Sequence, residues 1–248
     1  MRLTAELITN SLSYLNPLKE RELDLRGHKI PSIENLGVAK DHESIDFTDN
    51  DITILTNFPL SPRLQTLLCA RNRISSIQPS LSKSLPNLNT LVLAQNNLSE
   101  LADLDPLQGF AKLTHVSLLD NSVTSKENYR YWILWRAPQI RYLDFQKVKD
   151  AERTKAKELF GTFEEPTELA QSIIAVRSNK PLSYAGAPTT NGASKGQKLK
   201  ITEKEKKKFE ALVRKAKTLA EVQKLEKAFS EGRLPPGVGD DEDAMDES

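Results

Sequence analysis

Cysteine is almost missing from this 248-residue sequence, which contains only Cys69. Without a second thiol the chain can form no intrachain disulfide, which argues against the disulfide-capped scaffolds of extracellular proteins. Histidine is also scarce, and none of the three histidines lies in a metal-ligand spacing with cysteine or carboxylates. The sequence contains no nucleophile elbow, phosphate-binding loop or dinucleotide motif. We therefore expect a protein that is not an enzyme, with no catalytic residue, no metal site and no cofactor.

An excess of charge and a long apolar run are absent as well. The formal net charge is +1 with 28% charged residues, so bulk electrostatics demands neither nucleic acid nor membrane as a partner. No apolar run approaches the length of a membrane span. The first twenty residues lack the apolar core of a signal peptide, and their spacing predicts an amphipathic helix capped by Thr4. Nothing implies a membrane partner or a homo-oligomer.

What the sequence does contain is a repeat. In "LNTLVLAQNNLSEL" the apolar pair Leu91 and Leu93 starts a pattern that recurs along the chain. Its counterparts are Leu23 and Leu25, Ile45 and Phe47, Leu67 and Cys69, Val116 and Leu118, and, more weakly, Leu143 and Phe145. The first members lie at positions 23, 45, 67, 91, 116 and 143, so the spacing is 22 to 27 residues. This period and pattern are typical of leucine-rich repeats. Amphipathic helices would space their apolar residues three or four apart instead.

An asparagine follows four of these pairs three residues after the second apolar residue, at Asn50, Asn72, Asn96 and Asn121. This position is the corner at which the chain leaves the strand and the backbone needs hydrogen-bond partners. An amide side chain both donates and accepts hydrogen bonds. We therefore expect each asparagine to bond backbone N–H and C=O groups of its own and of the neighbouring repeat.

These patterns predict an α/β fold, a leucine-rich-repeat solenoid with a parallel concave sheet and a helical cap at each end. A tryptophan-rich stretch, "NYRYWILWRAP", is expected to form a helix that covers the last repeat. The predicted organisation is a repeat domain with caps at 1–165, a helical extension at 166–182, a linker rich in Pro, Gly and Ser at 183–200, an amphipathic helical segment at 201–232 and an acidic tail at 233–248.

A binding surface follows from strand geometry. If the paired apolar residues point into the core, the residues that alternate with them face the concave side. In the middle strands these are small or apolar, and in the first strands they are acidic. This combination suits an amphipathic helix with basic ends. The residues predicted to bind a partner are Asp24, Asp46, Thr48, Leu68, Ala70, Val92, Ala94, His115 and Leu119. Basic residues near the first strand and near the C-terminal cap could position phosphates or simply form a solvated face; the phosphate candidates are Arg21, Arg26, Lys147 and Lys149.

Longer motifs carry a family resemblance. The stretches "RELDLRGHKIPSIENLG", "IDFTDNDI", "FPLSPRLQTLL" and "APQIRYLDFQKVKDAER" resemble the A-prime proteins of the spliceosomal U2 small nuclear ribonucleoprotein, and "TLAEVQKLEKAFSEGRLP" adds a second match. The resemblance implies a nuclear splicing component. It implies a concave sheet that grips a helix of an RNA-recognition-motif (RRM) protein of the B-double-prime type, and binding of a U2 snRNA stem-loop by the pair. The linker, the lysine-rich start of the segment at 201–232 and the acidic tail diverge most from the family, so residues 201–232 are either a docking site for another splicing component or a solvated helix.

Two other functions remain open at this point. A leucine-rich-repeat regulatory subunit of a nuclear protein phosphatase would share the solenoid, although such proteins usually have more repeats of a regular 22 residues, whereas these lengthen. A free-standing RNA-binding protein is disfavoured by the near-neutral charge.

Overall fold

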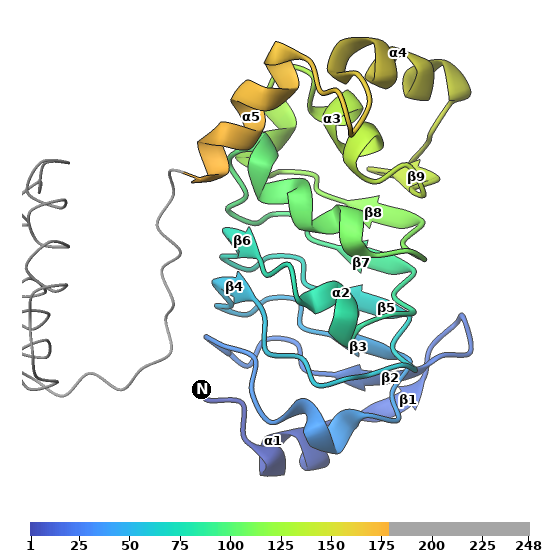
Figure 1. The fold of residues 1–248 in the computed structure, drawn as a ribbon. Coiled ribbons are helices and arrows are strands. Elements are labelled where there is room, and N and C mark those ends of the chain that lie inside the picture. Colours follow the sequence, from blue (N-terminus) through green and yellow to red (C-terminus); the bar gives the residue numbers. More distant parts are fainter. Residues whose placement is uncertain (179–248) are drawn as a thin grey trace, which may run out of the picture. The chain divides into compact units, whose positions relative to one another are not determined.

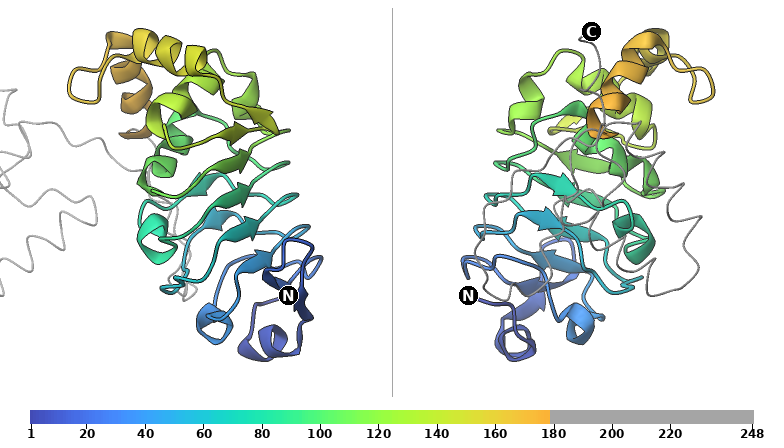
Figure 2. Two further views of the ribbon diagram at one scale, coloured as in Figure 1. Left: turned by 90° about the vertical axis from the view of Figure 1, so that its right-hand side faces the viewer. Right: turned by 60° about the vertical axis from the view of Figure 1, so that its left-hand side comes forward.

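The computed structural model describes residues 1–178. Its main element is an eight-stranded sheet in the order β1-β2-β3-β5-β7-β8-β9-β10. The strands lie one above another along the molecule, as Figure 1 shows and Figure 2 repeats in two further views. The repeat strands are β2 (Arg21–Asp24), β3 (Ser44–Asp46), β5 (Thr66–Leu68), β7 (Thr90–Val92), β8 (His115–Ser117) and β9 (Tyr142–Leu143).

All neighbours from β2 to β9 pair in parallel, and the register places equivalent repeat positions side by side. Leu23 pairs with Ile45, Ile45 with Leu67 and Leu67 with Leu91. These side chains and the second apolar residue of each of the first five pairs are buried. The predicted parallel solenoid is therefore confirmed.

The asparagine ladder is confirmed too. Asn72 accepts a hydrogen bond from the backbone N–H of Ile52 at 3.1 Å and donates to the carbonyls of Phe47 and Cys69 at 2.9 and 3.2 Å. Asn50, Asn96 and Asn121 repeat this arrangement, each linking its own corner to the preceding repeat. Three carbonyls, those of Phe47, Cys69 and Leu93, each accept hydrogen bonds from two successive asparagines of the ladder.

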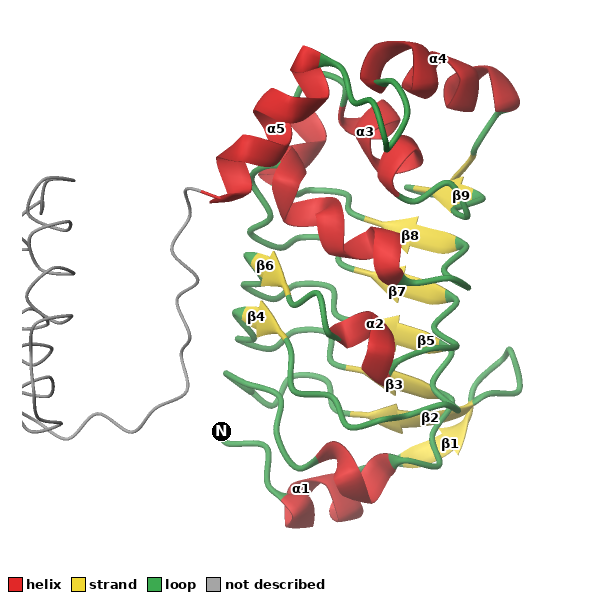
Figure 3. Cartoon of the chain, in the orientation of Figure 1, coloured by secondary structure: helices red, strands yellow, loops and turns green. Residues whose placement is uncertain are grey.

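The return segments close the core on the other side of the sheet. They contain the two-stranded sheet β4 (Ile54–Leu55) and β6 (Ser76–Ile77), the short helix α2 (Leu81–Ser84) and three 3₁₀ helices: η1 (Leu36–Ala39), η2 (Leu101–Gly109) and η3 (Ser122–Ser125). Figure 3 separates the layer of strands from these helices by colour. One apolar cluster runs through all repeats from Leu3 to Ala170.

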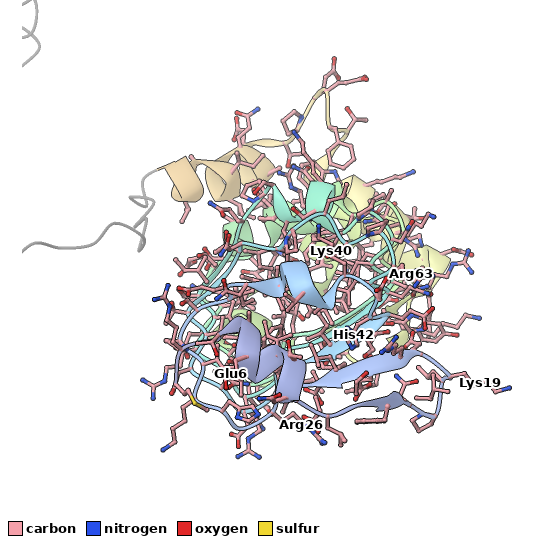
Figure 4. The ribbon with its side chains drawn as sticks, turned by 90° about the horizontal axis from the view of Figure 1, so that it is seen from below. Glu6, Lys19, Arg26, Lys40, His42 and Arg63 are labelled. Carbon is pink, nitrogen blue, oxygen red and sulfur yellow. The ribbon has the colours of Figure 1, made fainter. Side chains whose placement is uncertain are left out.

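The N-terminal end combines a helix with a hairpin. Helix α1 (Ala5–Asn10) begins at Thr4, whose hydroxyl accepts from the N–H of Leu7 at 3.1 Å, as predicted. Strand β1 (Ser13–Leu15) then pairs antiparallel with β2. Seen from this end in Figure 4, Lys19 lies at the tip of the hairpin and points away from the body of the molecule.

Three helices cover the other end: α3 (Tyr129–Arg136), α4 (Asp150–Phe160) and α5 (Glu168–Ser178). Trp132 and Trp135 of α3 are buried and pack against Phe160 of α4, with ring centroids 5.1 and 5.6 Å apart. The tryptophans thus plug the last repeat, as predicted. Helix α5 packs against α4 and η2 through buried Ala170.

The sixth repeat differs from the prediction. Leu143 is buried, but its expected partner Phe145 is 79% exposed. The chain reverses immediately after Leu143, because Asp144 and Phe145 both have positive φ and form a two-residue turn into β10 (Gln146–Lys147), which pairs antiparallel with β9. Phe145 therefore sits at the turn instead of in the core.

Within the part of the chain that the structure describes, no helix is both long and apolar enough to cross a bilayer. The predicted linker, the amphipathic segment at 201–232 and the acidic tail lie outside the described residues, so their boundaries stay predictions.

Candidate partner-binding face

The solvent-facing side of the main sheet, here called the concave face, carries rows of equivalent residues. Asp24 pairs with Asp46, Asp46 with Leu68, and Leu68 with Val92 across neighbouring strands. Adjacent strands lie about 4.8 Å apart, so these side chains form a continuous row. The register thus brings together the predicted partner residues of four repeats.

Five predicted residues make up an apolar patch on this face: Leu68, Ala70, Val92, Ala94 and Leu119. The first four are half-buried, while Leu119 is 39% exposed. They come from three successive turns of the solenoid, and none is needed to fill the core beneath. An apolar surface that crosses several strands is suited to burial against another molecule.

An acidic corner flanks the patch, and a cation occupies it. Arg26 forms an ion pair with Asp24 at 2.5 Å and approaches Asp46 to 3.6 Å. The hydrogen bond from this guanidinium holds the pKa of Asp24 below its usual value, although burial opposes the shift. Thr48 lies half-buried beside Asp46, whose carboxylate accepts from the Thr48 backbone N–H at 2.8 Å. A basic partner would therefore compete with Arg26 for these carboxylates.

Residues 13 to 20 form a contact that sequence reasoning missed. The hairpin places Tyr14 and Asn16 over Glu22, whose carboxylate accepts hydrogen bonds from them at 2.7 and 2.9 Å and from Ser44 at 3.0 Å. Burial raises the pKa of Glu22, but these hydrogen bonds outweigh it and the net shift is downward. The Asn16-Pro17 dipeptide, a common turn sequence, could have indicated this hairpin.

At the opposite end of the face, His115 is exposed and stacks on Tyr142 of the last repeat. Their ring centroids are 4.8 Å apart and the planes differ by 6°. Tyr142 is itself 39% exposed. The predicted partner residue His115 therefore belongs to an aromatic edge of the concave face.

The candidate phosphate residues do not form one site. Arg21 and Arg26 belong to the first repeat, whereas Lys147 lies in β10 and Lys149 precedes α4. Six strand spacings separate β2 from β10, which amounts to roughly 30 Å. All four side chains are exposed, but the guanidinium of Arg26 is held by Asp24. A single phosphate could reach one of the two groups only.

The described residues 1–178 contain no group of three or more His, Cys, Asp or Glu side chains placed to hold a metal ion. The thiol of Cys69 is buried, and burial raises its pKa well above the usual value. A thiol in that state is a poor nucleophile.

Comparison with known proteins identifies the family of this chain. A leucine-rich-repeat family model matches residues 1–174. The U2 small nuclear ribonucleoprotein A' of Neurospora crassa is 63% identical over the full length of both chains. The chain belongs to the U2 small nuclear ribonucleoprotein A' family. The Homo sapiens protein of that name is 44% identical, across 95% of this chain and 90% of the human one.

Among solved structures, the crystal structure of the Drosophila melanogaster SNF/U2A' complex contains a chain that is 47% identical. The match has a TM-score of 0.65 and covers 71% of this chain and 99% of that chain. As a member of the U2 small nuclear ribonucleoprotein A' family, the protein is a leucine-rich-repeat component of the spliceosomal U2 particle. This assignment favours a splicing component over the phosphatase regulatory subunit.

Proposed function

We propose that the protein is a non-enzymatic nuclear scaffold whose concave face binds a helix of an RRM protein of the B-double-prime type. The pair then binds the U2 snRNA 3′ stem-loop more tightly and more selectively than the RRM protein alone. The observation that carries the proposal is the apolar patch, which lies in register across adjacent strands and has carboxylates at one side.

The patch suits a helix because its geometry and charge are both complementary to one. Side chains at helical positions i, i+3 and i+4 share one face. They can lie over Leu68 and Val92, which pair across neighbouring strands, and over Leu119, which lies two residues beyond Ser117, the partner of Val92. Asp24 and the buried Asp46 carry two negative charges against the one positive charge of Arg26, so a basic end of that helix would meet a net negative corner and compete with Arg26 for it. The relative from Drosophila melanogaster was solved in a complex with a second protein, SNF, which supports a protein partner.

An RRM binds single-stranded bases on its own sheet. A scaffold that holds a helix on the opposite face of the RRM leaves that sheet free for RNA. The scaffold then contributes a coupling free energy: if the scaffold raises RNA affinity by some factor, RNA raises scaffold affinity by the same factor.

The test is a fluorescence titration of the stem-loop RNA at one fixed salt concentration with the scaffold alone, the RRM protein alone and both together. We expect the mixture to bind distinctly tighter than the RRM protein alone. Val92→Arg should abolish this gain and weaken protein binding at least tenfold, about 1.4 kcal/mol, because it buries an unpaired charge in the apolar patch.

The matched control is Val38→Arg, the same substitution at a 56% exposed valine of η1, outside the sheet. It should leave both affinities unchanged. If the wild-type protein adds nothing to any RRM protein, or if both variants behave alike, the concave face is not the binding surface.

A further inference from the structure

The turn between β9 and β10 contains a residue that the fold itself does not explain. Asp144 and Phe145 have φ values of 51° and 61°. Two-residue turns with both residues in the left-handed region favour Asn or Asp first and Gly second. A bulky side chain at the second position is strained.

Asp144 has a structural reason for its place. Its carboxylate accepts from the backbone N–H of Leu118 at 2.7 Å and from the hydroxyl of Tyr129 at 2.8 Å, which ties the turn to the preceding repeat and to α3. Phe145 gains nothing comparable, because 79% of it is exposed. A strained backbone that presents an aromatic ring to solvent indicates that the ring contacts another molecule.

The surroundings of Phe145 are basic and aromatic. Lys147 pairs directly with Tyr142 across the hairpin, so both side chains lie on the same face beside the His115–Tyr142 stack. Arg141 and Lys149 are also exposed.

Acidic residues near this turn are mostly engaged. Asp144 is held as described, and Glu152 forms an ion pair with Arg130 at 2.5 Å. Asp150, at the start of α4, is exposed. The partners of Asp144 are neutral, so its charge also counts; the three exposed cations Arg141, Lys147 and Lys149 still outnumber the carboxylates of Asp144 and Asp150.

We propose that Phe145 stacks on an unpaired base of the bound RNA, next to the phosphate candidates Lys147 and Lys149. The inference rests on the proposed function, because the RNA reaches the scaffold through the bound RRM protein. Aromatic rings stack on bases of any sequence, and unpaired loop bases are free to do so. An apolar pocket on a protein would fit this site less well, because it would have to desolvate the adjacent lysines.

The experiment uses the full chain with an RRM partner and the U2 stem-loop RNA, and measures partner binding without RNA separately. Three variants divide the possibilities: Phe145→Tyr keeps the ring, Phe145→Leu keeps only apolar volume, and Phe145→Gly removes the side chain and the strain. We expect Tyr to retain RNA affinity, and Leu and Gly to lower it about tenfold. Gly should also raise the melting temperature, since it adopts positive φ without strain.

Partner binding in the absence of RNA should be the same for all variants. Equal RNA affinity of Phe145→Leu and wild type would overturn the stacking model, and so would a loss of partner binding without RNA, which would assign Phe145 to a protein contact. If partner binding and the RNA gain survive in Phe145→Gly, this inference alone fails. If the wild-type chain binds no partner at all, the proposed function fails and this inference falls with it.

Discussion

Replacing Asn96 by alanine should destabilise the protein by an amount that can be worked out bond by bond. The Asn96 amide accepts from the N–H of Ile74 at 2.9 Å, and its NH₂ group donates to the carbonyls of Cys69 and Leu93 at 2.9 and 3.0 Å, with a longer contact to Ala94 at 3.2 Å. The carbonyls of Cys69 and Leu93 also accept from a neighbouring ladder asparagine, and that of Ala94 accepts from the N–H of Arg71, so each keeps one partner. The buried N–H of Ile74 loses its side-chain acceptor, which costs about 1–3 kcal/mol, and the two lost donations cost about 1 kcal/mol together or somewhat more. We expect a loss of about 3 kcal/mol in the free energy of unfolding.

The assay is urea denaturation of the full chain at 25 °C, in which the midpoint should fall while the slope stays unchanged. The adjacent Asn97 offers a matched control, because its side chain is exposed. Asn97→Ala should change stability by less than about 0.5 kcal/mol. An effect of Asn96→Ala below about 1 kcal/mol, or one no larger than that of Asn97→Ala, would show that the ladder does not hold the corners.

Two further substitutions test other parts of the structure. Gly161→Ala should cost about 2–4 kcal/mol, because the backbone has a φ of +76° and the added Cβ would lie 2.5 Å from the carbonyl oxygen of Glu165; a thermal melt checks this, and an unchanged midpoint would contradict it. Glu22 has a lowered pKa in the folded protein, so its stabilising contribution is present above the ordinary glutamate pKa of about 4.3 and is lost as the pH falls through the folded value. The melting temperature of wild type should therefore fall more steeply below about pH 4.5 than that of Glu22→Gln, and parallel curves would refute the assignment.

The parallel solenoid was predictable because its determinants are local and periodic. A strand of period two and a corner asparagine appear in each repeat, and five consistent copies leave few alternative folds. The same periodicity placed Leu68 and Val92 on the solvent-facing side of the sheet. The register between neighbouring strands then follows without further information, since equivalent positions of successive repeats must lie side by side.

The ends of the molecule were harder to predict, because no repeat constrains them. Phe145 matches the apolar pattern, yet the turn at Asp144 exposes it. The pairing of Glu22 with Tyr14 depends on a hairpin that occurs once in the chain. Arg26 and Asp24 form an ion pair, although the sequence predicts a phosphate contact for Arg26 and a protein contact for Asp24. Such non-repeating contacts leave no periodic trace in a sequence.

The antiparallel strands at both ends of the sheet limit the length of the concave face. Because β1 and β10 reverse the chain direction, another parallel repeat cannot simply be added at either end. The parallel part, from β2 to β9, therefore has a fixed length of five strand spacings, or about 24 Å. A helix rises 1.5 Å per residue, so about 16 residues of a helix laid across these strands would span them. If the partner helix lies along this face as proposed, a longer helix must project beyond one of the two hairpins.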